Sequence, residues 1–243
     1  NFANLSLFKT RFKSSRSNDG IEYKFFNDDL SGTLLIPEED NRNLSFRFDF
    51  IKINQDSSMS RDNFLSLYNS VEDHFNFSTE ALFLNSKNFG AWEFSILPET
   101  DQLILNDIKG TYGKWGLKRT NEGISSLTIH KKPVGWTSTL KTNIYSGSPE
   151  KAMQQIGIKP NFELDTLSLD VDLTWKNLPW LFDYNSINGE VFTDLKGLTI
   201  KNNEDLETTN NLLRLINIFN ITDSFEKVTN LDFRKLYKRG FSA

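Results

Sequence analysis

The chain has 243 residues, a formal net charge of −4 at neutral pH and no cysteine. The lack of cysteine excludes disulfides, thiolate metal sites and cysteine nucleophiles. Acidic and basic residues are interspersed along the chain, so we expect no nucleic-acid partner. The hydrophobic fraction of 37%, which includes 21 phenylalanines, is enough for a folded protein and argues against disorder.

The N-terminal part of the chain is predicted to consist of short strands. The polar run at residues 13–20 is predicted to be a loop. Residues 21–25 and 31–37 predict a hairpin with its turn at residues 27–29. Residues 44–53 alternate apolar and polar side chains, which is the pattern of a strand with one apolar face. The apolar positions predicted to share that face are Leu44, Phe46, Phe48 and Phe50.

The middle of the chain continues in the same way. Residues 56–70 have a mixed pattern that allows a short helix. Five or six strands between Ala81 and Tyr145, separated by Gly, Asn and Asp, predict an antiparallel meander. One of these strands has an apolar face made of Trp92, Phe94 and Ile96.

The C-terminal part adds two predicted helices and the clearest strand. Ser148, Pro149 and Gly157 mark the start and the stop of a short helix at residues 148–157. Residues 187–200 predict a hairpin, and residues 204–220 predict a longer, leucine-rich helix. Between the first helix and the hairpin lies a strand whose apolar face carries Leu167, Leu169, Val171, Leu173 and Trp175.

Residue patterns for chemistry are weak. His74 and His130 belong to no metal-binding motif, and the chain has neither a serine-hydrolase elbow nor a phosphate-binding loop, so we expect no metal and no cofactor. Asp170 and Asp172, or Glu163 and Asp165, would project from one strand face about 7 Å apart, a spacing that glycoside hydrolases can use. On the polar face of a strand such pairs are usually solvated. We therefore expect no enzymatic activity.

The number of apolar strand faces exceeds what the predicted helices can cover. A sheet of about eleven strands spaced by about 4.8 Å would extend roughly 50 Å. Either this sheet closes on itself as a sandwich or barrel, or it curls into a trough whose apolar lining faces a hydrophobic ligand. The pattern alone leaves both possibilities open.

A strand that ends with Trp175, Pro179 and Trp180 is followed by a turn at Asn188 and Gly189 and, further on, by a segment from Leu231 to Phe241. In this order of motifs, most of the chain from about Ile21 onward resembles the C-terminal region of the AsmA-like family, in its YhdP branch, and the match is dense after Phe89. That branch has a leucine-rich helix, matched at residues 212–219, although its usual glycines are replaced here by NNEDLETTNN. The Arg-Arg-Leu that precedes a later motif of the branch is here Val228, Thr229 and Asn230. The residues that match the motifs of the branch are Trp175, Pro179, Trp180, Asn188, Gly189, Leu231, Asp232, Phe233, Gly240 and Phe241.

The resemblance implies a mainly β fold: a long curved antiparallel sheet, or taco-like β-groove, with two or three short helices near the C-terminus. It implies that residues 1–243 form one elongated segment of a larger Gram-negative envelope protein, mostly strands up to residue 145. Such a protein would be periplasmic, monomeric and anchored to the inner membrane by an N-terminal segment that this chain does not include. It would carry phospholipid between the inner and outer membranes.

On this reading, the apolar strand faces contact phospholipid acyl chains. The hypothesised lipid-contacting residues are Leu44, Phe46, Phe48, Phe50, Trp92, Phe94, Ile96, Leu167, Leu169, Val171, Leu173 and Trp175. The main alternative is a structural or adhesive β-sandwich domain of the envelope with a dry core and no ligand. A glycan-active enzyme that uses Asp170 and Asp172 is a weaker third alternative.

Overall fold

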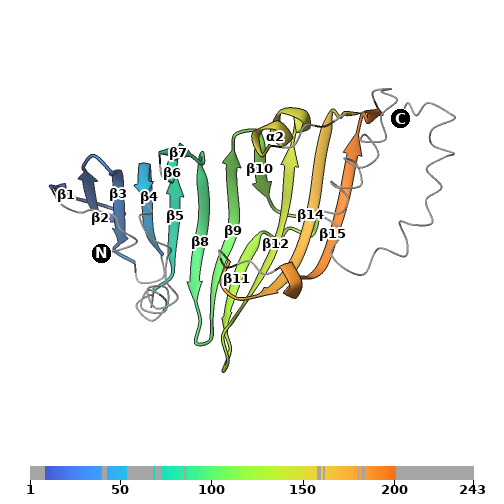
Figure 1. The fold of residues 1–243 in the computed structure, drawn as a ribbon. Coiled ribbons are helices and arrows are strands. Elements are labelled where there is room, and N and C mark those ends of the chain that lie inside the picture. The colour runs from blue at the N-terminus through green and yellow to red at the C-terminus, as the bar shows by residue number, and fades with distance from the viewer. Residues whose placement is uncertain are drawn as a thin grey trace. The chain divides into compact units, whose positions relative to one another are not determined.

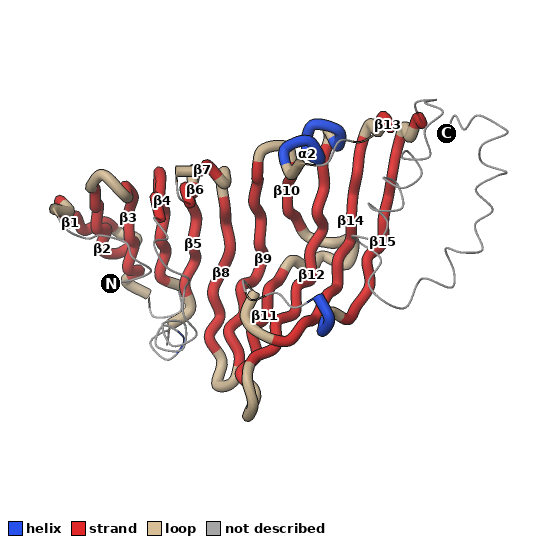
Figure 2. Tube along the Cα trace, in the orientation of Figure 1, coloured by secondary structure: helices blue, strands red, loops and turns tan. Residues whose placement is uncertain are grey.

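The computed structural model describes residues 9–39, 43–53, 68, 73–84, 86–157, 160, 162–179, 181 and 184–200. The described chain is mainly β-strand, as predicted, and most of its strand pairs are antiparallel (Figures 1 and 2). It divides into two compact units: unit 1 is formed by residues 1–112 and 126–132, and unit 2 by residues 113–125 and 133–243. The predicted helix at residues 204–220 and the motif residues from Leu231 to Phe241 lie outside the described residues.

Unit 1 contains a single sheet within its described residues. Its main path runs through seven strands in the order β1, β2, β3, β4, β5, β8 and β9, with β11 paired to β9, β6 paired to β4 and β7 paired to β6. The strands are β1 (Arg11–Ser17), β2 (Gly20–Phe26), β3 (Leu30–Pro37), β4 (Leu44–Ile53), β5 (Phe75–Thr79), β6 (Leu82–Leu84), β7 (Lys87–Asn88), β8 (Trp92–Pro98), β9 (Gln102–Tyr112) and β11 (Ser126–Lys131).

The first strand corrects a prediction. Residues 13–20 were expected to form a loop, but residues 13–17 belong to β1, which pairs with β2 from Arg11↔Phe26 to Ser17↔Gly20. Every residue of β1 is exposed, so its polar composition carries no burial penalty. Backbone hydrogen bonds to β2 therefore decide its conformation. The predicted hairpin of β2 and β3 is confirmed, and Asn27 Oδ1 shapes its turn by accepting hydrogen bonds from the N–H groups of Asp29 and Leu30.

The prediction of an antiparallel sheet is wrong at one place. Strand β4 pairs in parallel with β5 and with β6. A parallel pair cannot be closed by a tight turn and needs a connection of about a dozen residues or more. Residues 54–74, which include the possible short helix at residues 56–70, provide this connection, and most of them lie outside the described residues.

Unit 2 contains further strands and the described α-helix. Strands β10 (Trp115–Lys118), β12 (Trp136–Ser146), β14 (Thr166–Lys176) and β15 (Asn188–Lys196) follow one another in that order. Helix α2 (Pro149–Gln155) confirms the predicted helix at residues 148–157. A 3-10 helix, η1 (Tyr184–Ser186), precedes β15.

The predicted hairpin at residues 187–200 is not formed. Strand β15 pairs with β14, whereas β16 (Thr199–Ile200) pairs with β13 (Phe162–Glu163) in a separate two-stranded sheet. Gly197 has a φ of 67°. This left-handed conformation suits glycine and turns the chain away from β15 instead of folding it back.

The core of unit 2 forms around β14. Leu167, Leu169, Val171 and Trp175 are between 0% and 4% exposed. Helix α2 contributes Met153, which is 1% exposed, and the indole of Trp115 on β10 donates a hydrogen bond to the carbonyl of Ala152 at 2.9 Å. Because each buried apolar side chain of this size stabilises the fold by about 1.5–3 kcal/mol, this packing holds α2 against the sheet.

The other face of β14 is polar. The Lys141 ammonium on β12 lies 2.8 Å from the Asp172 carboxylate. Thr139 and Thr174 share a hydrogen bond of 2.9 Å, two residue pairs further along the same two strands. The alternation that the sequence predicts for residues 167–175 is thus confirmed, with apolar side chains in the core and polar ones outside.

Replacing Leu169 by Ala removes a fully buried side chain, and we expect unit 2 to lose about 2–5 kcal/mol of stability through the cavity left behind. Urea unfolding followed by circular dichroism measures this loss. Val134→Ala is the control, because Val134 is 95% exposed and should change stability by no more than about 0.5 kcal/mol. Equal shifts for the two variants would contradict the assignment of Leu169 to the core.

The hydrogen bond to Asp172 raises the pKa of Lys141. A raised lysine pKa means that the pair stabilises the fold fully below the ordinary lysine pKa and that this contribution disappears as pH rises through the folded-state pKa. We expect Asp172→Asn to lower the pKa of Lys141, as measured by NMR titration of its side chain. Asp49→Asn, in unit 1, should leave that pKa unchanged.

Candidate functional site

One face of the unit 1 sheet gathers aromatic side chains from several strands. Phe46 on β4 is paired with Phe77 on β5, and Phe77 is paired with Phe94 on β8. The neighbouring row contains Leu44, Phe75 and Ile96 in the same order of strands. We call this surface the aromatic face; it consists of Phe25, Leu44, Phe46, Phe48, Phe75, Phe77, Trp92, Phe94 and Ile96.

The rings of the aromatic face contact one another. The centroids of Phe77 and Phe94 are 4.6 Å apart, those of Phe48 and Phe77 are 5.4 Å apart, and those of Phe46 and Phe75 are 5.5 Å apart. Aromatic pairs at such distances contribute about 0.5–1.5 kcal/mol each beyond the area they bury. The rings therefore hold one another in place across three strands.

A glycine extends this contact to β2. Gly32 on β3 lies between Phe25 on β2 and Phe48 on β4 in the register of the sheet. A Cβ atom at Gly32 would lie only 2.2 Å from the carbonyl oxygen of Arg47, so a larger residue would push the backbones of β3 and β4 apart. Since no side chain rises from β3 at this point, the rings of Phe25 and Phe48 meet across it with centroids 5.4 Å apart.

The aromatic face is only half-buried. All nine of its residues retain partial exposure, in contrast to the buried residues of β14. Smaller buried pairs flank it, formed by Leu30 with Ile51 and by Leu103 with Ile129. Every described strand of unit 1 belongs to the same sheet, so no second described sheet of this unit packs on the aromatic face. An accessible apolar surface of this kind is typical of a binding site.

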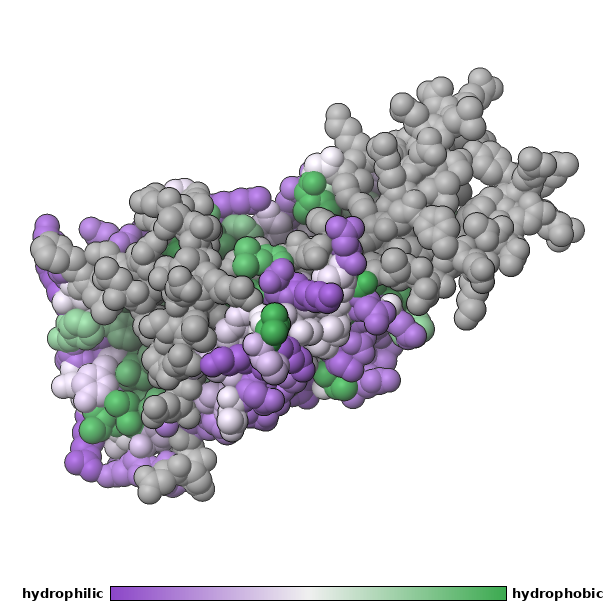
Figure 3. Space-filling model, turned by 60° about the horizontal axis from the view of Figure 1, so that its bottom comes forward, coloured by the Kyte–Doolittle hydropathy of each residue, from purple (hydrophilic) through white to green (hydrophobic). Residues whose placement is uncertain are grey.

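The opposite face of the same strands is polar. Arg47 and Asp49 on β4 are exposed, as are Asn76 on β5 and Glu93 on β8. The sheet of unit 1 is therefore amphipathic across its thickness. Figure 3 shows hydrophobic residues as separate green groups among purple hydrophilic ones on the side of the molecule seen there.

Phe50 does not belong to the aromatic face, which corrects the prediction. Gly32 pairs with Phe48, but the next residue back along β3, Ser31, pairs with Phe50, because the register shifts between Ser31 and Gly32. Asp49 is the extra residue of this bulge. Neighbouring residues of β3 point to opposite faces, so Phe50 lies on the polar face while Phe48 lies on the aromatic face. The ammonium of Lys52 lies 5.2 Å from the centre of the Phe50 ring.

The hypothesised lipid-contacting residues fall into two environments. Leu44, Phe46, Phe48, Trp92, Phe94 and Ile96 come together in unit 1. Leu167, Leu169, Val171 and Trp175 are buried in unit 2 and have almost no free surface for a ligand, whereas Leu173 is half-buried. Phe25, Phe75 and Phe77 belong to the aromatic face but were not among the predicted residues. The alternation of Phe75, Asn76 and Phe77 was a usable signal, but it is only three residues long.

The motif residues near the end of β14 have structural roles. The indole of Trp175 is buried and donates to the carbonyl of Leu178 at 3.5 Å. Asn177, with a φ of 86°, turns the chain just before Pro179. Asn188 and Gly189 were expected in a turn but begin β15, opposite Thr174 and Leu173. Trp180 lies outside the described residues.

The carboxylates considered for catalysis are held by neighbouring side chains. Asp170 accepts hydrogen bonds from Asn143 at 2.6 Å and from Asn121 at 2.9 Å, and Asp172 is paired with Lys141. His74 immediately precedes β5, and His130 is on β11. Among the described residues, no group of three or more His, Asp or Glu side chains is arranged to hold a metal ion.

The chain matches the model of a known protein family. The model of the YhdP protein family matches residues 1–243, which is the full length of the sequence. Comparisons with curated proteins and with solved structures gave no match. No helix in the described part of the chain has both the length and the apolar character needed to cross a membrane. YhdP proteins are bacterial envelope proteins of a family related to lipid transport. The match over its whole length shows that the chain belongs to the YhdP protein family.

Proposed function

We propose that the aromatic face of unit 1 binds the acyl chains of phospholipid. The chain would then be a segment of a lipid-transfer groove that carries phospholipid between the inner and outer membranes of a Gram-negative envelope. One observation carries this proposal: unit 1 has a continuous aromatic surface that is half-exposed rather than packed into a core. Membership of a family related to lipid transport supports phospholipid as the ligand class.

The physical chemistry of such a face suits transport. Each acyl methylene group that leaves water contributes about 0.8 kcal/mol, and this attraction has no preferred direction. A chain can therefore slide along the rings without breaking directional bonds, while its headgroup stays at the wet edge. The proposal needs no catalytic residue. It includes the curvature of the sheet into a trough, which would enclose the acyl chains on more than one side.

The burial of apolar side chains in unit 2 favours a different role for this unit. Its β14 face is buried by protein, as in the alternative of a structural envelope domain with a dry core. We therefore assign lipid contact to unit 1 and a supporting role to unit 2. The proposal places the chain in the periplasm as a monomer, linked to the inner membrane through a segment outside this sequence, as the resemblance implies.

A photo-crosslinking amino acid at position 48 should capture phospholipid in cells, because Phe48 lies on the aromatic face. The matched control is position 50 on the same strand, which the bulge at Asp49 turns to the polar face. We expect lipid adducts at position 48 and few or none at position 50, as read by mass spectrometry. Equal labelling at both positions, or none at position 48, would remove the main support for the proposal.

A charge on the aromatic face should weaken lipid binding. In Phe77→Asp, the loss of one aromatic side chain removes about 1.5–3 kcal/mol of apolar burial, so we expect at least about a tenfold drop in the phospholipid that co-purifies with the chain. Ser78→Asp places the same charge one residue along β5, on the polar face, and should keep its lipid. Circular dichroism shows whether both variants are folded. A folded Phe77→Asp variant with unchanged lipid content would contradict the proposal.

A further inference from the structure

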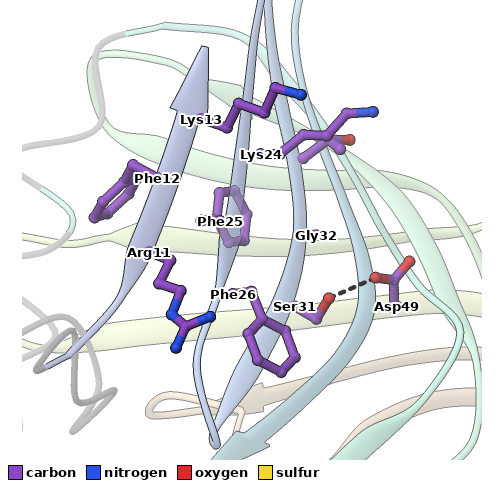
Figure 4. Close-up of a pocket in the computed structure, with 10 residues that line it drawn as sticks. Arg11, Phe12, Lys13, Lys24, Phe25, Phe26, Ser31, Gly32 and Asp49 are labelled. Carbon is purple, nitrogen blue, oxygen red and sulfur yellow. Dashed lines mark hydrogen bonds between the residues drawn. The ribbon is translucent and has the colours of Figure 1, made fainter.

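A small basic hollow lies on the polar face of unit 1, on the other side of the sheet from the aromatic face. It has a volume of about 420 Å³. Its polar lining comes from β1, β2, β3 and β4, and Figure 4 shows Lys13 and Lys24 toward one end and the hydrogen bond from Ser31 to Asp49 toward the other. We call this site the basic hollow; the polar-face side chains that line it are Arg11, Lys13, Lys24, Phe26, Ser31, Thr33 and Asp49.

The register of the sheet brings like charges together here. Lys13 is directly opposite Lys24, Lys24 is opposite Thr33, and Thr33 is opposite Arg47. Three cations therefore share one row across four strands. Like charges at directly opposed positions of a sheet destabilise it. The chain as a whole has a net charge of −4, so this local excess of positive charge is not a general feature of its surface.

Most of these cations lack a counter-charge within the protein. Lys24 lies 3.2 Å from Glu22, but neither Arg11, Lys13 nor Arg47 forms an ion pair with any residue that the structure describes. The carboxylate in the hollow, Asp49, accepts a hydrogen bond of 2.6 Å from Ser31 in the next row of the sheet. The hydroxyl of Thr33 makes no hydrogen bond to a described residue and lies between the cations.

Protection of a sheet edge does not explain this arrangement. Lysine and arginine on an edge strand prevent edge-to-edge association, and this accounts for Arg11 and Lys13 on β1. It does not account for Lys24 on β2 or Arg47 on β4, which are inner strands with neighbours on both sides. The inner cations add repulsion without protecting an edge.

We propose that the basic hollow binds the phosphate group of an anionic ligand. A guanidinium can donate hydrogen bonds to two phosphate oxygens at once, and lysine ammonium groups attract the remaining phosphate oxygens as point charges. The Thr33 hydroxyl can donate a further hydrogen bond to the phosphate. The phosphate can belong to a small soluble ester or to a lipid headgroup at a membrane surface. This site is independent of lipid binding by the aromatic face, because the two surfaces lie on opposite sides of the sheet.

The test compares two variants of the full chain that lose the same charge. The first replaces Arg11, Lys13 and Lys24 by Gln. The control replaces Lys109, Lys114 and Lys132, which are exposed and lie outside the hollow, by Gln. The probes are inorganic phosphate and glycerol 3-phosphate, followed by calorimetry, and phosphatidylcholine vesicles with and without phosphatidylglycerol, followed by co-sedimentation. Vesicle binding is also measured for the hollow variant and the control when each carries Phe77→Asp. This comparison distinguishes vesicle binding that is lost at the aromatic face from vesicle binding that is lost at the hollow.

The hollow variant should bind phosphatidylglycerol vesicles at least about tenfold more weakly than the control, since each cation near an anionic surface contributes appreciably to binding. If the hollow variant also loses binding to the soluble probes, a free phosphate ester is a sufficient ligand for the hollow. If it loses binding to vesicles alone, the ligand is a lipid headgroup at a membrane surface. Both results support the site. Identical binding by the hollow variant and the control with both classes of probe overturns it.

Stability provides a second readout. Because the hollow variant removes opposed like charges, it should unfold at a urea concentration no lower than the wild-type chain does in low salt. A phosphate probe that binds should raise the urea midpoint of the wild type and leave that of the hollow variant unchanged. A hollow variant that unfolds earlier than the control would show that these cations stabilise the sheet, which contradicts the proposal.

Discussion

The hydrogen-bonded ladder between strands is the constraint on which both candidate surfaces depend. In a strand, successive side chains point to opposite faces, so the register between two strands decides which residues become neighbours. Phe46, Phe77 and Phe94 meet because three strands are aligned in one register, and Lys13, Lys24 and Arg47 share a row on the other face for the same reason. The bulge at Asp49 shows how strict this rule is, since one extra residue moves Phe50 to the opposite face.

The two units give the same sequence pattern different environments. Strand β4 and strand β14 both alternate apolar and polar residues, and sequence alone treats them as equivalent. In unit 2 the apolar side chains of β14 are buried together with Met153 and Trp115, whereas in unit 1 those of β4 pack mainly against rings of the same sheet. The difference lies in which elements cover each face, and the alternation of residues within one strand does not predict those elements.

Local patterns predicted the elements that depend on local signals. The helix at residues 148–157, the hairpin of β2 and β3 and the alternation in β14 follow from a proline at the helix start, a turn at Asn27 and a period of two. The failures involve long-range partners: β1 is a strand because β2 pairs with it, β5 runs parallel to β4 because of a long connection, and β16 pairs with β13. The aromatic face was predicted in part, from β4 and β8, but the strand between them was too short to reveal Phe75 and Phe77 as members.

The missing side chain at Gly32 also fixes the direction of the aromatic surface. The contacts among Phe25, Phe48, Phe77 and Phe94 run from strand to strand across the sheet, with one diagonal step from Phe48 to Phe77, because the missing side chain at Gly32 lets the rings of Phe25 and Phe48 meet. An acyl chain lying along this row would cross the sheet in steps of about 4.8 Å, the spacing of neighbouring strands. The length of such a track is then set by the number of strands and not by their length. A protein built this way could lengthen its path by adding hairpins at the sheet edge while leaving every existing contact in place.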